Sequence, residues 1–115
     1  MHRIALKPLS INEAWKGRRF RTDACKAFQQ AMALVLPKRL EIPEGKLMLM
    51  LQFGVSSKNA DIDNPAKVTI DCLQKKYGFN DKRIYGLAVQ KVDVPKGQEF
   101  IEFAIAALPS EEGKA

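Results

Sequence analysis

The sequence predicts an α/β fold of the α+β kind, in which a small mixed sheet of about four strands packs with two helices. Two segments carry apolar residues at helical spacing, and each is bounded by a capping residue and by a proline or glycine. An apolar run between them has the composition of a central strand. Two strand-like segments follow near the C-terminus, so the element order is β-α-β-α-β-β in one pair of layers.

Both predicted helices have clear boundary residues. In the first, Thr22 is a favourable N-cap and Pro37 stops the helix. In the second, Asn64 is the expected N-cap, Pro65 occupies the favoured first position and Gly78 ends the helix. The apolar positions that should contact the sheet are Ala24, Phe28, Ala31, Met32 and Val35 in the first helix, and Ala66, Ile70, Leu73 and Tyr77 in the second.

Four segments are predicted as strands. A short strand at 2–7 precedes the first helix, and the apolar run 46–55 is expected to be buried on both faces at the centre of the sheet. The segments 84–94 and 98–107 are expected to form a hairpin across the turn 95–97. The core-filling side chains of the central strand should include Met48 and Met50.

The length of 115 residues fits a single domain (1–115), with an ordered core at 1–108 and a flexible tail at 109–115. A domain this small would gain core by dimerising. No segment is long and apolar enough to cross a bilayer, and the N-terminus lacks the features of a signal peptide, so we expect a cytoplasmic protein without membrane contact. Two cysteines without metal-ligand neighbours are expected to be small buried apolar residues: Cys25 and Cys72.

Positive charge is concentrated in the N-terminal half of the chain. Residues 1–58 hold 11 basic and 4 acidic residues, a net charge of +7, whereas residues 59–115 hold 8 basic and 9 acidic residues, a net charge of −1. This distribution suits contact with a phosphate backbone, although a solubilising surface is the simpler interpretation. The segment 8–21 has no regular period and is interpreted as a loop that grips phosphates, with Trp15 or Phe20 either stacking on bases or packing in the core. Its basic residues are Lys16, Arg18, Arg19 and Arg21.

Acidic residues gather around the start of the second predicted helix. Asp61 and Asp63 are two positions apart in an extended segment, so their carboxylates point the same way, next to a helix N-terminus that favours anions. Lys67 follows Asp63 by one helical turn, where its charge would stabilise a phosphate transition state. Asp71 lies one turn further on and would orient the lysine. Simple helix capping and a solvated Asp-Lys pair are the alternative interpretations.

A further aspartate, Asp81, follows the same helix. Because a helix of about a dozen residues is about 18 Å long, either the loop after it folds back or a second subunit contributes Asp81 to the cluster. Three hard oxygen ligands with room for water and phosphate suit Mg²⁺, which activates the attacking water in phosphodiester hydrolysis. The single histidine, His2, is near the terminus, and the sequence has no glycine-rich phosphate loop, so the acidic cluster is the candidate site.

The residues of this cluster form the motif Asp-x-Asp-Asn-x-x-Lys, at Asp61, Asp63, Asn64 and Lys67. Over roughly residues 4–107 the chain resembles the RusA family of Holliday junction resolvases, found in bacteria and prophages. Asn80 departs from the family pattern, which often has an aspartate there, and leaves Asp81 as the acidic residue of its turn. The further matches are Asp71-Cys72-Leu73, Gly78-Phe79, Asn12 in the early loop, the basic run Lys16 to Arg21, and Lys91.

The resemblance implies a homodimeric, Mg²⁺-dependent endonuclease that nicks two opposed strands of a four-way DNA junction in recombination and repair, with Mn²⁺ as a substitute metal. It implies four catalytic residues, of which the aspartates bind the metal and the lysine assists: Asp61, Asp63, Asp81 and Lys67. Supporting roles fall to Asn64 and Asp71. The DNA contacts that we expect are Asn12, Lys16, Arg18, Arg19, Arg21, Lys58 and Lys91.

Three alternatives to a junction resolvase stay open. The first is a nuclease with the same site that acts on flaps or other branched DNA. The second is a non-catalytic DNA-binding protein of the same fold, against which the full set of aspartates speaks. The third is a small dimeric interaction module that binds no nucleic acid, which would leave the +7 charge of residues 1–58 unexplained.

Overall fold

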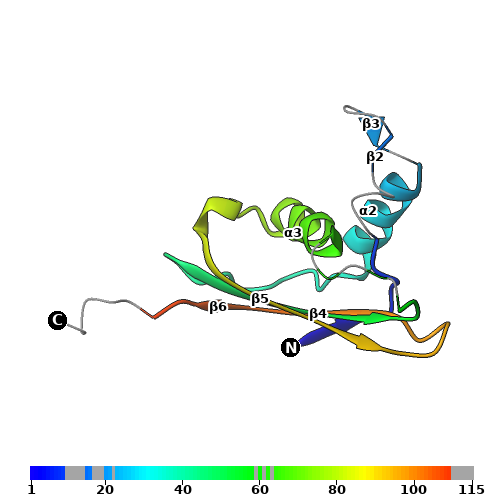
Figure 1. Ribbon diagram of the computed structural model, residues 1–115. Helices are drawn as coiled ribbons and strands as arrows, with labels where there is room; N and C mark the ends of the chain where they lie inside the picture. The colour runs from blue at the N-terminus through cyan, green and yellow to red at the C-terminus, as the bar shows by residue number, and fades with distance from the viewer. Residues whose placement is uncertain are drawn as a thin grey trace.

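Two helices cover one face of a four-stranded mixed sheet in the computed structural model (Figure 1). The structure describes residues 1–9, 15–16, 20–21, 23–58, 60, 62 and 64–109. The predicted α+β class and element order are confirmed. The main elements are β1 (His2–Ile4), α2 (Asp23–Val35), β4 (Leu47–Val55), α3 (Asn64–Tyr77), a 3-10 turn η1 (Asp81–Arg83), β5 (Ile84–Asp93) and β6 (Phe100–Ala107).

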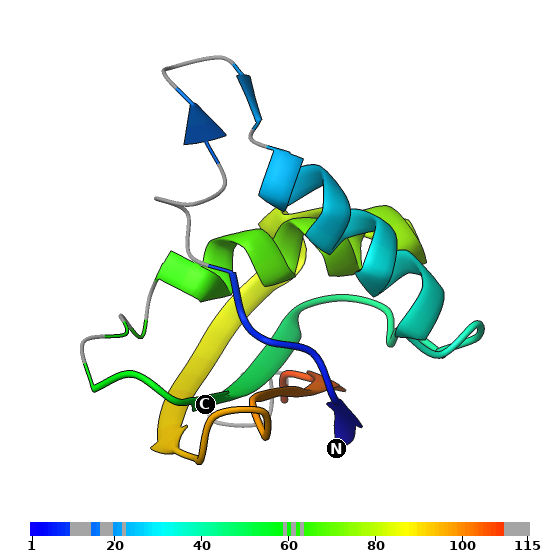
Figure 2. The same cartoon turned by 90° about the vertical axis from the view of Figure 1, so that its right-hand side faces the viewer.

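The strand β4 is central, as predicted. It pairs with β6 in the antiparallel direction and with β5 in the parallel direction, which gives the sheet order β1-β6-β4-β5. The prediction that both of its faces are buried is wrong, because both helices lie on the same side of the sheet (Figure 2). Alternate residues from Leu47 to Phe53 are buried in the core, whereas Met48 and Met50 lie half-buried on the uncovered face and are not core residues.

The predicted hairpin between the last two strands is also wrong. The strands β5 and β6 are not neighbours, because β4 lies between them. Their connection instead passes the end of β4, where the Val94 N–H donates to the Val55 carbonyl at 2.8 Å and the Ser56 hydroxyl donates to the Glu99 carboxylate at 2.7 Å. The turn at 95–97 therefore reverses the chain without pairing the strands on either side of it.

The helices match their predicted ranges within about a turn. In α2 the buried residues are Cys25, Phe28 and Met32, and α3 begins at Asn64 and ends before Gly78, whose positive φ of 72° suits glycine. Both cysteines are buried and not disulfide-bonded, as expected. Two hydrogen bonds join the ends of the two helices. The Tyr77 hydroxyl donates to the Pro37 carbonyl at 2.8 Å, and Lys76 Nζ donates to the Ala33 carbonyl at 2.8 Å.

The early segment contains more regular structure than the sequence indicated. Instead of a loop throughout, its described part has two short antiparallel strands, β2 (Trp15–Lys16) and β3 (Phe20–Arg21). Residues 110–115, most of the expected flexible tail, lie outside the described residues. Among the helices of the described part, none is long and apolar enough to span a membrane.

Candidate active site

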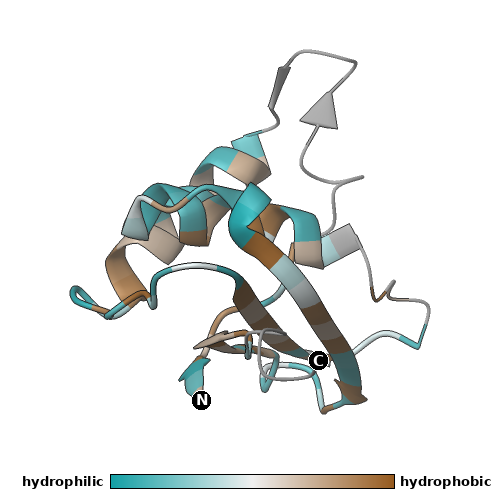
Figure 3. Ribbon diagram, turned by 90° about the vertical axis from the view of Figure 1, so that its left-hand side faces the viewer, coloured by the Kyte–Doolittle hydropathy of each residue, from teal (hydrophilic) through white to brown (hydrophobic). Residues whose placement is uncertain are grey.

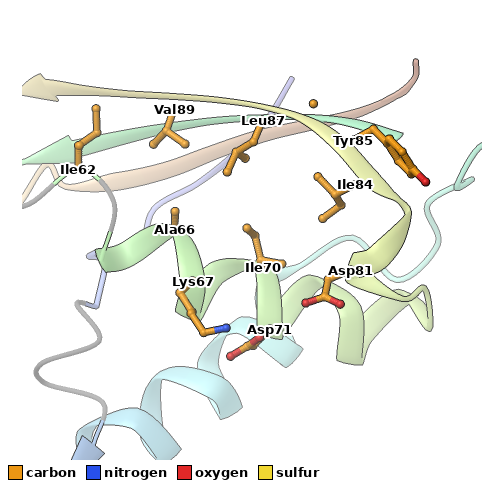
Figure 4. Close-up of a pocket in the computed structure, with 11 residues that line it drawn as sticks. Ile62, Ala66, Lys67, Ile70, Asp71, Asp81, Ile84, Tyr85, Leu87 and Val89 are labelled. Carbon is orange, nitrogen blue, oxygen red and sulfur yellow. The ribbon is translucent and has the colours of Figure 1, made fainter. Parts of the chain in front are cut away.

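A groove of about 620 Å³ runs between α3 and β5. Figure 4 shows apolar side chains from β5 and from the side of α3 that faces it, and three charged side chains at the edge formed by α3 and η1. The apolar lining comes from Ile62, Ala66, Ile70, Ile84, Leu87 and Val89. The charged residues are Lys67, Asp71 and Asp81. A carboxylate above an apolar wall interacts more strongly with a cation than it would in open water, because less solvent screens it.

The chain folds back after α3, and this places Asp81 in the groove. The Asp81 N–H donates to Gln74 Oε1 at 3.2 Å, so η1 is held against the side of α3. The Asn80 carboxamide oxygen accepts from the Lys82 N–H at 2.9 Å and caps η1 at its N-terminus. Asp81 therefore lines the same groove as Lys67 within one subunit.

One guanidinium fixes η1 from the opposite direction. Arg83 Nε donates to the Gly45 carbonyl at 3.0 Å, and its Nη2 donates to the Pro43 carbonyl. These bonds join η1 to the segment that leads into β4. The turn that carries Asp81 is thus held at both of its sides.

Lys67 and Asp71 lie one helical turn apart on α3 and line the same groove. Lys67 is exposed and Asp71 is half-buried. The sequence suggested a lesser role for Asp71 than for Asp81, yet both aspartates line this one groove.

The two aspartates of the sequence motif, Asp61 and Asp63, lie outside the described residues. Ile62, which separates them in the chain, lines the groove and is 41% exposed. Close by in sequence, the Ala60 carbonyl accepts a hydrogen bond of 2.6 Å from Lys91 Nζ on β5. Lys91 thereby anchors the segment that leads into the motif.

The other predicted site residues are placed less completely. Asn12, Arg18 and Arg19 lie outside the described residues. Lys16 and Arg21 belong to the neighbouring strands β2 and β3, and only their backbones are described. Lys58 is exposed in the turn after β4, and Asn64 begins α3.

The donor set of the groove fits a hard divalent cation. Mg²⁺ is usually held by one or two carboxylates, and substrate phosphates and water complete its octahedron. Of the three aspartates predicted to bind metal, Asp81 lines the groove, and Asp71 places a second carboxylate on its wall. Within the part of the chain that the structure describes, no three acidic, histidine or cysteine side chains cluster closely enough to hold a metal by themselves.

Comparison with protein-family models identifies the family of the chain. The family model named endodeoxyribonuclease RusA matches residues 10–102. The chain belongs to the RusA family. Its groove, motif segment and basic early segment all fall inside the matched range. A search of curated proteins found no match.

Membership of the RusA family implies a general function for the chain. The family is one of endodeoxyribonucleases, so the chain belongs to a family of enzymes, and membership implies nuclease activity of the Holliday junction resolvase type. Sequence reasoning missed the residues that hold the groove in place: Gln74, Arg83 and the Ala60 carbonyl. Only the capping role of Asn80 had a local signal, an amide directly before an acidic turn.

Proposed function

We propose that this RusA-family chain is a Mg²⁺-dependent endonuclease that resolves four-way DNA junctions by paired, symmetric nicks in recombination and repair. The observation that supports it best is the groove that Asp71, Asp81 and Lys67 line together, lined also by Ile62 of the Asp-x-Asp motif. This combination joins hard oxygen ligands with a cation, as hydrolysis of a phosphodiester requires.

The aspartates of the proposed site bind and orient the metal. Asp61, Asp63 and Asp81 would hold Mg²⁺, which supplies an activated water and neutralises the leaving oxygen when it is bound. Mn²⁺ has similar preferences for oxygen ligands and would substitute for it.

The remaining residues of the groove act on the phosphate and on water. Lys67 places its ammonium group where negative charge grows on the scissile phosphate. Asp71, one turn along α3, keeps the lysine oriented. The apolar side of the groove removes water from one side of the reacting group, which strengthens these electrostatic interactions in part.

A homodimer would explain how two opposed strands are cut. A two-fold dimer presents two identical sites related by the same symmetry as an ideal junction. Sedimentation equilibrium of the full chain should give twice the chain mass of 12.9 kDa at working concentration. A single-chain mass under cleavage conditions would rule out the paired geometry.

The decisive test is cleavage of a synthetic mobile junction with the nicks mapped on all four strands. The wild-type chain should nick two opposed strands at symmetric positions in Mg²⁺, and chelation of the metal should stop the reaction. Asp63→Asn should lower the cleavage rate on the order of 100-fold or more, because a charged ligand of the reacting centre is lost. Junction binding in a gel should survive the substitution.

The same assay separates the rival functions. Flap and duplex substrates of equal length should be cut much more slowly than the junction, and preferential flap cutting would assign the site to other branched DNA. Full activity of Asp63→Asn would overturn the site assignment. Binding without any cleavage by the wild-type chain would identify a DNA-binding protein that kept the fold.

A further inference from the structure

Two further hollows lie beside the active-site groove in the helical layer. The first hollow, of about 540 Å³, shares Asp71 with the groove and is also lined by Gln74 and Gln29. The second, of about 490 Å³, lies between α2 and α3 and shares Gln29 and Lys75 with the first. Because each neighbouring pair shares wall residues, the three hollows lie next to one another along α3.

The charged residues that line the hollows change from mostly acidic in the groove to basic between the helices. The described residues that line the hollow between the helices include three lysines and no carboxylate: Lys26, Lys75 and Lys76. Lys76 Nζ donates to the Ala33 carbonyl, so this lysine also ties α3 to α2. Lys26 and Lys75 are exposed, one on each helix. Figure 3 shows that hydrophilic residues recur along both helices.

The spacing of charged residues along α3 suits a polyanion that passes from the groove to the hollow between α2 and α3. Lys67, Asp71 and Lys75 follow one another at intervals of four residues, so they form one row along the helix. The row is about 12 Å long. Measured along the axis of a duplex, where one strand rises about 3.4 Å per nucleotide, this corresponds to three or four nucleotides. The negative charge of Asp71 is flanked by a lysine one turn away on either side.

We propose that the cleft between α2 and α3 (defined by Lys26, Gln29, Gln30 and Lys75) binds the phosphate backbone of a DNA strand that runs out of the active-site groove. The lysines would act as point charges and the exposed Gln30 amide as a donor to phosphate oxygens, so the contact would position DNA without reading its sequence. This inference rests on the proposed function only in taking DNA as the substrate. It adds a grip on the strand that is separate from the basic early segment.

The test compares the salt dependence of DNA binding by the full-length chain. The probes are a synthetic four-way junction and a duplex of the same arm length, titrated between roughly 50 and 200 mM salt in Ca²⁺ or chelator to prevent cutting. Lys26→Gln/Lys75→Gln should lower the slope of log K against log salt by about 1.8, because each lost phosphate contact removes about 0.9. Affinity should fall at least about 10-fold at the lower salt concentration.

Matched variants keep this test independent of folding and of catalysis. Lys38→Gln/Lys96→Gln removes the same two charges from exposed positions that line none of the three hollows, and its slope should stay near that of the wild type. Lys26→Arg/Lys75→Arg should retain binding. Equal slopes for the cleft and control variants would overturn the proposal, even if the wild-type chain cuts junctions. Conversely, a wild-type chain that binds but does not cut would leave the slope comparison valid.

Discussion

Single long side chains hold the active-site groove together across distant parts of the chain. Lys91 reaches the Ala60 carbonyl over 31 positions, and Arg83 reaches the Gly45 carbonyl over 38. Neither contact could be predicted from sequence, because a lysine or arginine gives no local signal of the distant carbonyl that it meets. The Asp-x-Asp motif, in contrast, stands out in the sequence, although its two aspartates lie outside the described residues.

The bond from Lys91 to Ala60 suggests a role for the lysine besides the DNA contact predicted from the sequence. We expect Lys91→Met to raise the Mg²⁺ concentration for half-maximal cleavage and to lower activity by about 10- to 100-fold, as is typical when a group that orients metal ligands is lost. The measurement is a Mg²⁺ titration of junction cleavage, with Lys91→Arg as the matched control that retains the charge and a donor.

Junction binding distinguishes the two roles of Lys91. If the lysine anchors the segment, the salt slope of junction binding should not change in Lys91→Met. A slope lowered by about 0.9, with an unchanged Mg²⁺ requirement, would instead assign Lys91 to a phosphate contact.

At the scale of elements, local signals located the helices and strands but not their neighbours. Pro37, Pro65 and Gly78 marked the helix ends because each acts on the backbone within a few residues. The turn at 95–97 also marked a reversal of the chain correctly. However, the strand that lies between β5 and β6 is β4, which precedes α3 in the sequence. Strand pairing depends on contacts between residues that are distant in sequence. The alternating buried apolar residues of β4 favour its central position in the sheet.

The 3-10 turn η1 depends on its cap. Replacing Asn80 by alanine removes the oxygen that accepts from the Lys82 N–H, and should destabilise the chain by about 1 kcal/mol in urea unfolding. Cleavage should fall as well, because the same turn carries Asp81. Asn80→Asp should preserve both stability and activity, since an aspartate caps equally well. A stable but inactive aspartate variant would show that the amide has a chemical role beyond capping.

The contact between the helix ends predicts a loss of stability in alkali. Burial raises the pKa of Tyr77 above its ordinary value of 10.0, and its hydroxyl donates to the Pro37 carbonyl. Since the folded-state pKa is the higher one, this contribution is complete below the unfolded pKa and is lost as pH rises through the folded value.

Tyr77→Phe tests this contribution directly. At about pH 8 the variant should be less stable than the wild type by about 1 kcal/mol, the usual net value of one hydrogen bond. The difference should shrink at a second pH well above the ordinary tyrosine value of 10.0, once the wild-type hydroxyl has ionised. Urea unfolding at the two pH values measures it, and a constant difference would show that the titration of Tyr77 is not linked to folding.

For the whole molecule, the candidate site lies where the two layers meet: α3 supplies Lys67 and Asp71, η1 supplies Asp81, and β5 supplies half of the apolar wall. Composition and motif predicted that metal and phosphate chemistry would be found near the start of α3. They could not predict that Asp71 shares the groove with Asp81, because this depends on how tightly the chain folds back after Gly78.

This arrangement predicts that a divalent cation stabilises the folded chain. A ligand at ten times its dissociation constant adds about 1.4 kcal/mol to the free energy of unfolding, which is several degrees, roughly 3–6 °C, in Tm for a domain of this size. Mg²⁺ should therefore raise the wild-type Tm in a thermal melt without DNA, and Asp81→Asn should abolish most of the increase. Asp93→Asn, a matched change on β5 that does not line the groove, should retain it. Equal increases in both variants would exclude Asp81 as a ligand, because a group that binds the metal cannot be neutralised without weakening its affinity.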